Sequence, residues 1–219
     1  MARNKYPEQT VEKILDVSEK LFIEKGYDNT SIQNIIDGLG GLSKGAIYHH
    51  FRSKEEIFYA VADRYNRSIV SYFQKMKDDT HMTGFEKLKK MFALSLGDKS
   101  MDFAYVTSPD FVKNPELLSM LILEIFTAVA PDYMEPVIRQ GIEDGSIQVD
   151  YPKEISEMIC TLTNVWMNPA LAHTDAENAE QKVRSFAKVL DGIGLKGVID
   201  EDMVQMYINY IRRYNKGTK

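Results

Sequence analysis

Apolar side chains recur every three or four residues along most of this 219-residue chain, and no stretch sustains the apolar–polar alternation that marks a strand. A spacing of three and four gathers these side chains on one face of a helix, where they can form a core. Hydrophobic residues make up 44% of the chain, which is enough for that core. The sequence therefore predicts an all-α fold.

The first two predicted helices are marked by their end residues. Pro7 suits the first turn of a helix, and Gly26 suits the end of the same helix. The segment Thr30-Ser31-Ile32-Gln33 has the pattern of a capping box with Thr30 as the N-cap. It predicts a short second helix that stops near Gly40-Gly41.

A third short helix and a long fourth one follow. Ser43 is a suitable N-cap for a helix from Lys44 to about His50, in which Ile47 and Phe51 can face the core together. A second capping box begins at Ser53 and opens an apolar pattern that continues to Met76. At ~1.5 Å per residue, these 24 or so residues span roughly 36 Å, long enough to join a small head to a separate body.

The rest of the chain predicts a helical body. Prolines and their preceding residues mark its turns, because the residue before proline avoids the helical region. We divide the chain into a head, residues 1–54, and a body, residues 55–219. Helices are expected in the body near 84–97, 115–129, 132–144, 153–168, 176–191 and 201–214.

Composition limits the class of protein. The single cysteine, Cys160, excludes an internal disulfide and a multi-cysteine metal site, and we interpret it as a buried small hydrophobe. No apolar run follows the basic residues near the N-terminus, and Leu117–Ala130 is too short and too polar for a membrane span. We therefore expect a cytoplasmic protein without membrane association. The net charge of −5 argues against nucleic acid, but residues 1–54 carry +1 and the remainder −6.

Two short helices joined by a glycine turn, with polar and basic residues at the start of the second, are typical of a helix-turn-helix. The major groove, about 12 Å wide, admits such a helix. Small residues at its start, Gly45 and Ala46, would let the backbone approach DNA. Thr30 and Ser43, as predicted N-caps, and the amides near Lys54 are placed to hold phosphates, and Lys54 adds positive charge.

At these positions the chain resembles the tetracycline-repressor (TetR) family of bacterial regulators over about residues 10–60. The resemblance is carried by Thr30, Gly40, Ser43-Lys44-Gly45, Ile47-Tyr48, His50-Phe51 and Ser53-Lys54-Glu55. It implies a dimeric repressor whose body binds a small ligand. It also implies that Lys44, Tyr48 and His49 contact bases or phosphates, that Lys54 meets a phosphate, and that Ala46 lies closest to a base edge. The turn Gly40-Gly41-Leu42-Ser43 is one residue longer than the family's usual one, so the recognition helix is expected to be tilted or shifted.

The methionine- and aromatic-rich body has two interpretations. Such residues at helical spacing usually form core, but an apolar pocket between helices is where a small ligand would sit. The ligand candidates are Met91, Tyr105, Met120, Glu124 and Trp166, although Glu124 is also consistent with simple exposure. Candidates for a dimer interface are Met158, Leu162, Val183, Phe186 and Leu190, whose stripes are equally consistent with internal core.

The resulting hypothesis is a homodimeric repressor that binds a palindromic DNA operator and releases it when a small, largely apolar effector binds. An activator of the same architecture is the alternative, followed by a helical ligand carrier or enzyme. No convergent acid–base or nucleophile set supports an enzyme, because His81 and His173 fall in predicted loops. Adjacent His49-His50 do not share a helix face, so no metal site is expected, and no cofactor is expected either.

Overall fold

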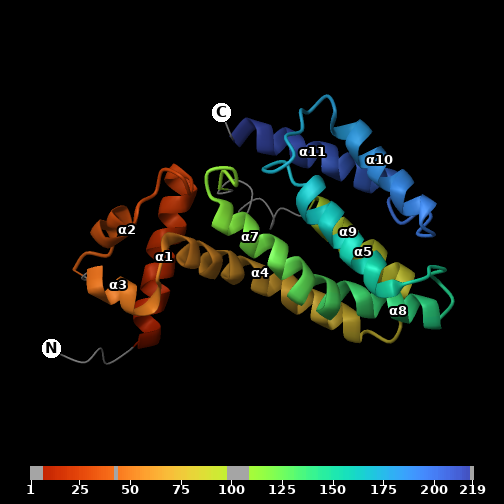
Figure 1. Ribbon diagram of the computed structural model, residues 1–219, viewed down its shortest axis with the longest axis horizontal. Coiled ribbons are helices and arrows are strands. Elements are labelled where there is room, and N and C mark those ends of the chain that lie inside the picture. The colour runs from red at the N-terminus through yellow and green to blue at the C-terminus, as the bar shows by residue number, and fades with distance from the viewer. Residues whose placement is uncertain (1–6, 42–43, 98–108, 218–219) are drawn as a thin grey trace.

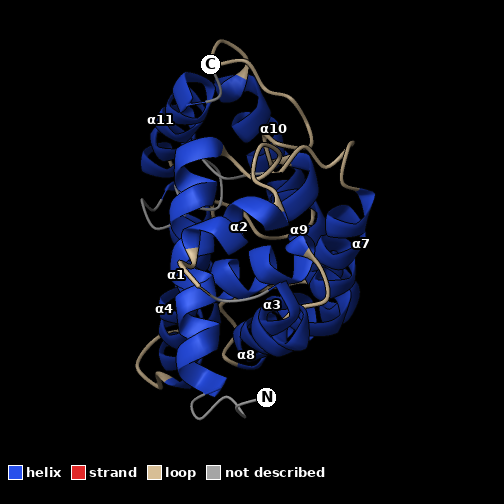
Figure 2. Ribbon diagram, turned by 90° about the vertical axis from the view of Figure 1, so that its left-hand side faces the viewer, coloured by secondary structure: helices blue, strands red, loops and turns tan. Residues whose placement is uncertain are grey.

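The computed structural model describes residues 7–41, 44–97 and 109–217. Within these ranges all regular structure is helical, as the sequence predicts, and no strand occurs (Figure 2). The first three helices lie together at one end of the molecule, and the remaining helices form a longer body beside them (Figure 1). The expected architecture of a small head joined to a helical body is therefore present.

The head consists of α1 (Pro7–Lys25), α2 (Ile32–Gly38) and α3 (Lys44–His50). Helix α1 ends where Gly26 takes the left-handed φ of +76°, which glycine adopts without a steric penalty. The N-cap of α2 is Ser31 and not Thr30: the Ser31 hydroxyl accepts from the Asn34 amide, and the Asn34 side chain accepts from the Ser31 amide. The predicted capping box is thus displaced by one residue, because Asn34 serves where we expected Gln33.

Helix α4 (Lys54–Asp78) runs from the head into the body (Figure 1). Ser53 is its N-cap, as predicted, and accepts a hydrogen bond from the Glu56 amide. Arg64 in α4 lies 2.8 Å from Asp16 and 3.2 Å from Glu19 of α1. These ion pairs fix α1 against the third turn of α4.

Beyond α4 the body contains eight helical segments in the described ranges, and they correspond to the six predicted helices. Their bounds are α5 (Gly84–Gly97), α7 (Pro115–Glu124), η2 (Ile125–Met134), α8 (Glu135–Glu143), α9 (Pro152–Thr161), η3 (Leu162–Trp166), α10 (Ala179–Gly192) and α11 (Glu201–Gly217).

The predicted break at Ala130-Pro131 is wrong. Helix α7, the π-helical segment η2 and helix α8 follow one another without a loop, and Pro131 lies inside η2. In an α-helix the proline ring would clash with the carbonyl group four residues earlier, and that carbonyl would lose its N–H partner. The wider π turn redistributes the backbone hydrogen bonds, so the chain passes the proline without ending the helix.

The helix Pro115–Glu143 therefore has 29 residues, twice the length of the apolar stretch considered in the sequence. By length and composition alone it would be able to cross a membrane, a test that core helices of soluble proteins also pass. Only 22% of its most apolar window is buried inside the protomer, so this helix leaves much apolar surface uncovered.

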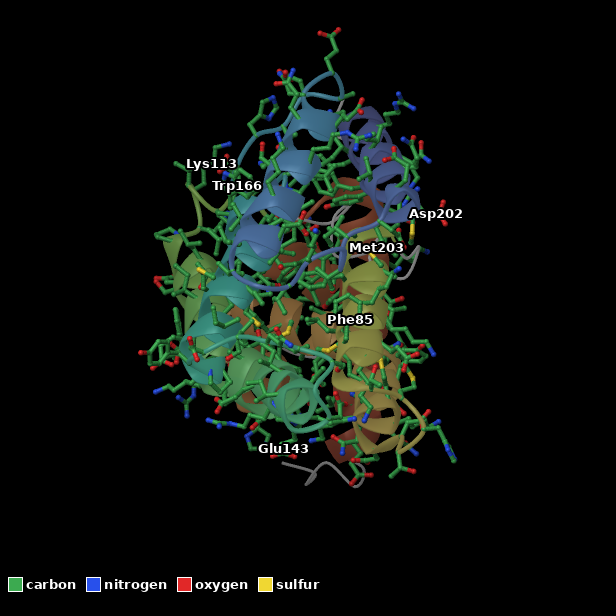
Figure 3. All side chains as sticks on the ribbon, turned by 90° about the vertical axis from the view of Figure 1, so that its right-hand side faces the viewer. Phe85, Lys113, Glu143, Trp166, Asp202 and Met203 are labelled. Carbon is green, nitrogen blue, oxygen red and sulfur yellow. The ribbon has the colours of Figure 1, made fainter. Side chains whose placement is uncertain are left out.

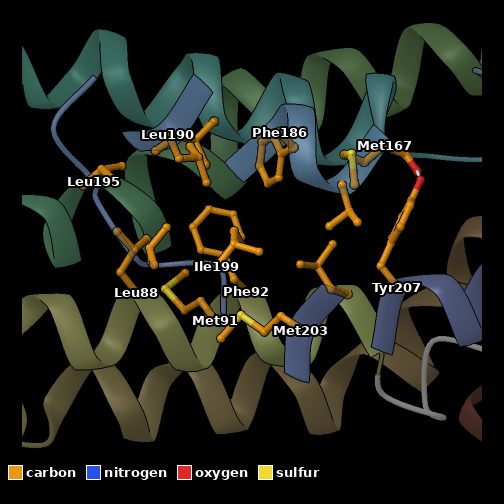
Figure 4. Close-up of a cluster of buried hydrophobic side chains, with 14 of the residues drawn as sticks. Leu88, Met91, Phe92, Met167, Phe186, Leu190, Leu195, Ile199, Met203 and Tyr207 are labelled. Atoms are coloured by element: carbon orange, nitrogen blue, oxygen red, sulfur yellow. Dashed lines mark hydrogen bonds between the residues drawn. The ribbon is translucent and has the colours of Figure 1, made fainter. Parts of the chain in front are cut away.

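Two clusters of buried side chains hold the protein together. The body cluster joins α5, α8, α9, α10 and α11 and includes Leu88, Phe92, Phe186 and Tyr207 (Figure 4). The head cluster contains α1–α3 residues together with Ile57, Phe58 and Val61 of α4 and Phe111 and Leu117 beyond it. The head's core thus extends past residue 54, although the division at that residue stays a prediction.

Candidate nucleic-acid interface

Helix α3 is held by its apolar side and turns its polar side to solvent. Ile47 is fully buried and Phe51 nearly so, and both belong to the head cluster. On the other sides Lys44, Gly45 and His49 are exposed, and 45% of Tyr48 is accessible. The sequence predicted this division, because Ile47 and Phe51 are one helical turn apart.

The turn before α3 depends on glycine. Gly40 has a φ of +58° and Gly41 one of +122°, both in the left-handed range that other residues rarely adopt. Leu42 and the predicted N-cap and phosphate contact Ser43 lie outside the described residues. The expected effect of the longer turn on the placement of α3 stays a prediction.

The exposed side of α3 carries basic and aromatic side chains. The Lys44 ammonium lies 5.7 Å from the centre of the Tyr48 ring, and the His49 and His50 rings are 5.1 Å apart. From Gly38 to Lys54 the sequence contains no acidic residue, and Arg52 adds another exposed cation. This local excess of positive charge contrasts with the net charge of −5 for the whole chain, and it is the pattern that attracts a phosphate backbone.

Two of the predicted phosphate contacts are occupied within the head. Thr30 is buried, and its hydroxyl donates to the Gly26 carbonyl at 2.8 Å and lies 3.3 Å from the Leu21 carbonyl. Its assignment as a DNA contact is therefore corrected: Thr30 closes the corner between α1 and α2. The Lys54 ammonium donates to the Tyr27 carbonyl at 2.9 Å and lies 3.9 Å from the Tyr27 ring centre. Lys54 thus points into the head, and its contact with phosphate stays a prediction.

Tyr27, Lys54 and Glu55 form a coupled group at the base of α4. The Tyr27 hydroxyl donates to the Glu55 carboxylate at 2.8 Å. Burial and then Glu55 raise the Tyr27 pKa, and burial lowers the pKa of Lys54. Burial also acts to raise the pKa of Glu55, but hydrogen bonds from its own amide, Tyr27 and Ser53 outweigh it, so the net pKa of Glu55 is lowered. This group fixes the start of α4 on the loop after α1.

The segment before and within α7 connects the body to the head. The Asp28 carboxylate accepts from the Asp110 amide at 3.0 Å and from the Asn114 side chain at 2.7 Å. The Tyr59 hydroxyl of α4 donates to the Leu117 carbonyl of α7 at 2.8 Å. A movement of α7 would therefore be passed to both the head and α4.

This geometry is shared with known regulators. Residues 14–61 match the family model described as bacterial regulatory proteins, tetR family, and residues 110–189 match the one described as tetracyclin repressor-like, C-terminal domain. Together the two matches cover more than half of the chain. The chain belongs to the TetR family.

Relatives and solved structures support the same fold. An HTH-type transcriptional regulator of Staphylococcus aureus strain USA300 is 34% identical over 70 residues, which cover 32% of this chain and 37% of that relative. The match therefore spans little more than a third of that relative's length. A TetR-family transcriptional regulator from Pectobacterium atrosepticum superposes with a TM-score of 0.61 at 20% identity, covering 89% of this chain and 99% of that one. Salmonella enterica GusR gives 0.60 at 18% identity, covering 98% and 100%.

The predicted ligand residues of this TetR-family body do not come together at one site. Met91 is buried in the body cluster (Figure 4), whereas Met120 lies on the exposed side of α7. Glu124 is exposed on α7 as well, and desolvation by its neighbours and then the negative charge of Asp63 raise its pKa. Trp166 (Figure 3) is 37% exposed, with the Lys182 ammonium 5.4 Å from its ring centre, and Tyr105 lies outside the described residues.

Three of the predicted dimer residues are internal. Val183, Phe186 and Leu190 of α10 are fully buried in the body cluster, so their assignment to a dimer interface is wrong. Their stripe faces α5 and α11 of the same protomer, and the opposite face of α10 is charged, with Arg184 bound to Glu180 and Glu201. Met158 and Leu162 of α9 and η3 are half-buried, and their role stays a prediction.

Sequence reasoning missed a group of polar residues inside the body. Ser95, Thr163, Asn164 and Tyr210 line a small cavity between α5, η3 and α11. The adjacent Thr163-Asn164 pair interrupts the apolar pattern of the predicted helix 153–168, and that interruption was the available signal. Ser95 of α5 and Tyr210 of α11 lie far from this pair in the sequence, so only the fold brings these side chains together.

Proposed function

We propose that the protein is a cytoplasmic, sequence-specific DNA-binding transcriptional regulator that acts as a homodimer, and that it is a repressor released by a small molecule. The observation that carries this proposal is α3: its apolar side is anchored in the head cluster, and its exposed side presents Lys44, Tyr48 and His49. A rigidly held helix with basic and aromatic side chains on its free face is the device that reads a major groove.

Selection of bound sequences from a random pool of duplex DNA tests the function directly. A homodimer is expected to enrich a twofold-symmetric motif with half-sites about one helical turn apart, roughly 34–36 Å. Failure to enrich any motif would refute sequence-specific binding. Repression and activation are then separated by transcription from a promoter carrying the motif, with and without the protein.

Variants of α3 test which face binds. Lys44→Ala and Tyr48→Ala are each expected to weaken operator binding at least about tenfold, or about 1.4 kcal/mol. Loss of a phosphate contact by Lys44 should also reduce the slope of log K against log salt by about 1. The controls are Lys188→Ala, an exposed lysine of α10, and Tyr72→Ala, a tyrosine of α4 that is 43% exposed against 45% for Tyr48. Equal losses in the controls would contradict the assignment.

For the dimer, we place the second copy on the exposed side of α7 and η2. Four large apolar residues lie there, Met120, Ile122, Leu123 and Phe126, with exposed fractions from 40% to 62%. Met120, Leu123 and Phe126 follow at intervals of three residues, and Ile122 lies four before Phe126, so the four side chains form one surface. Exposed apolar patches of this kind mark contact sites. The charged outer face of α10 offers no such surface.

Sedimentation measurements test this placement. Leu123→Glu or Phe126→Glu should convert dimer to monomer, because each variant buries an unpaired carboxylate in the interface. Val112→Glu is the matched control, because Val112 is 91% exposed and lies outside α7. A dimer that persists in both α7 variants would exclude this surface.

A further inference from the structure

A cavity of about 60 Å³ lies in the body between the end of α5, the π-helical segment η3 and helix α11. Leu96 and Met167 give it an apolar part. Its polar lining comes from Ser95, Thr163, Asn164, Asn168, Tyr207 and Tyr210. Since one water-sized group needs about 10–15 Å³ of this space, there is room for a molecule of about four to six non-hydrogen atoms.

The serine and threonine hydroxyls of this lining can accept hydrogen bonds from a ligand. The hydroxyl of Ser95 donates to the Met91 carbonyl at 2.9 Å, and that of Thr163 donates to the Ile159 carbonyl at 2.9 Å. The Tyr207 hydroxyl donates to the Met167 carbonyl at 3.0 Å, a contact visible in Figure 4. A hydroxyl has one proton and two lone pairs, so the hydroxyls of Ser95 and Thr163 have used their protons and keep lone pairs for a partner.

The side-chain amides of the lining add donors as well as acceptors. The Asn164 nitrogen donates to the Cys160 carbonyl at 2.9 Å, which leaves its second N–H and the carboxamide oxygen available to a ligand. The Asn168 oxygen accepts from the Ala170 amide, which leaves the Asn168 NH2 group as a donor. The cavity therefore presents neutral donors and acceptors, and it favours a molecule that both accepts and donates hydrogen bonds.

Charge distinguishes between the possible ligands. Among the described residues that line the cavity, none is acidic, basic or histidine. An ammonium or carboxylate group placed there would lose its hydration without gaining a counter-charge, which costs far more than the transfer of a neutral amide or hydroxyl. An uncharged ligand is thus favoured over a charged one of equal size.

We propose that this cavity binds a small uncharged molecule that both donates and accepts hydrogen bonds, of the primary amide or diol class. The proposal rests on the proposed function in one respect, because it takes this molecule to be the effector of the regulator. It differs from the largely apolar effector that the sequence led us to expect. Helix α11, which supplies Tyr207 and Tyr210, lies beyond the residues matched by either family model.

The cavity has a short connection to the head. Met167 and Asn168 line it, and Ala170 and Leu171, two and three residues further on, pack against the head cluster. The Asn168 side chain accepts from the Ala170 amide at 3.0 Å and so ties the lining to this turn. A ligand that displaces Asn168 would shift Leu171 against the core that anchors α3.

Binding is tested with four probes of nearly equal size on the full-length protein: butanamide, 1,2-butanediol, butylammonium and butyrate. In a ligand-observed NMR titration the two neutral probes should bind at least about tenfold more tightly than the two ions, a difference of about 1.4 kcal/mol. Binding of none of the four, or preference for either ion, would overturn the proposal.

Two variants locate the site. Thr163→Val removes a hydroxyl at nearly constant volume, and Asn164→Leu fills the cavity with an apolar side chain. Both should weaken butanamide binding at least about fivefold, whereas Asn209→Leu, on the exposed side of α11, should leave it unchanged. Unaltered binding in both cavity variants would place the ligand elsewhere and refute the assignment.

The coupling to DNA is measured separately. Butanamide should weaken operator binding by the wild type, and Leu171→Ala should bind butanamide normally while losing that effect. Normal ligand binding with no effect on operator affinity in the wild type would overturn the effector role. Absence of DNA binding without ligand would instead refute the proposed function, since the titration does not depend on DNA.

Discussion

Replacing Gly84 with alanine tests how closely α5 and α8 pack at the far end of the body. A Cβ atom on Gly84 would lie 2.2 Å from the Gly141 nitrogen and 2.6 Å from the Val137 carbonyl oxygen, whereas ordinary contacts begin at 3.4 Å. The shortfall exceeds 1 Å and involves backbone on both sides, so no side-chain rotation relieves it. The two helices must separate or tilt.

The cost follows from what that separation disturbs. The Gly84 amide donates to Asp144 at 2.8 Å, and the Phe85 amide to Ser146 at 3.1 Å, so the start of α5 is capped by the turn after α8. Overpacking alone costs typically 1–3 kcal/mol, and weakening these caps adds to it, so we expect about 3 kcal/mol. For a chain of this length that corresponds to a fall in Tm of roughly 6–12 °C.

Thermal unfolding followed by circular dichroism measures the effect. The matched control is Gly192→Ala, because a Cβ at Gly192, in the last turn of α10, meets nothing within 4 Å. Alanine is favoured over glycine in a helix by up to about 1 kcal/mol, so the control should be neutral or slightly stabilised. A Gly84→Ala protein that melts with the wild type would refute the close approach of α5 and α8.

Three further predictions concern single side chains. Arg64→Gln should lower the stability by about 1 kcal/mol in low salt and by less in high salt, because it leaves Asp16 and Glu19 facing each other across a partly exposed site. Chemical denaturation at two ionic strengths measures this effect, and a loss that does not depend on salt would contradict the prediction. Glu55 has a folded pKa below its ordinary value of 4.5, so its contribution to stability is complete above that value and is lost as the pH falls through the folded pKa. Glu55→Gln should therefore flatten the stability–pH profile below the ordinary pKa of 4.5, and an unchanged profile would show that the Tyr27 contact is unimportant. Burial raises the pKa of Cys160 to about 12, so its thiol should react with a disulfide reagent at pH about 8 only after unfolding; rapid reaction of the native protein would disprove its burial.

Local signals in the sequence predicted the helices well where the end of a helix is decided by neighbouring residues. Gly26 and Ser53 mark an end and a start correctly because left-handed φ and a side-chain cap are properties of a few residues. Thr30 and Ser31 are equally capable caps, and tertiary contacts decide between them: Thr30 is drawn inward by the Gly26 carbonyl. Pro131 failed as a stop signal because a π-helical turn accommodates it.

The candidate sites were less predictable because they depend on which side of a helix is covered. The α3 face follows from the spacing of Ile47 and Phe51, and the sequence therefore indicated it. The stripe on α10 has the same spacing, but nothing local says whether another protomer or α5 covers it, and Phe186 proved to be core. The polar cavity joins Ser95, Thr163 and Tyr210 from three distant helices, a juxtaposition that only the assembled fold creates.

The make-up of the head cluster bears on how such regulators can be recombined. Phe111 and Leu117 belong to the body in sequence but complete the core beneath α1 and α4. A hybrid made by grafting only residues 1–54 onto a foreign body would leave that core open, and its DNA-reading end would be poorly ordered. Exchange of DNA-binding specificity between relatives should succeed only when residues 1–61 and 109–121 are transferred together. The sequences of these two stretches should therefore diverge as a pair.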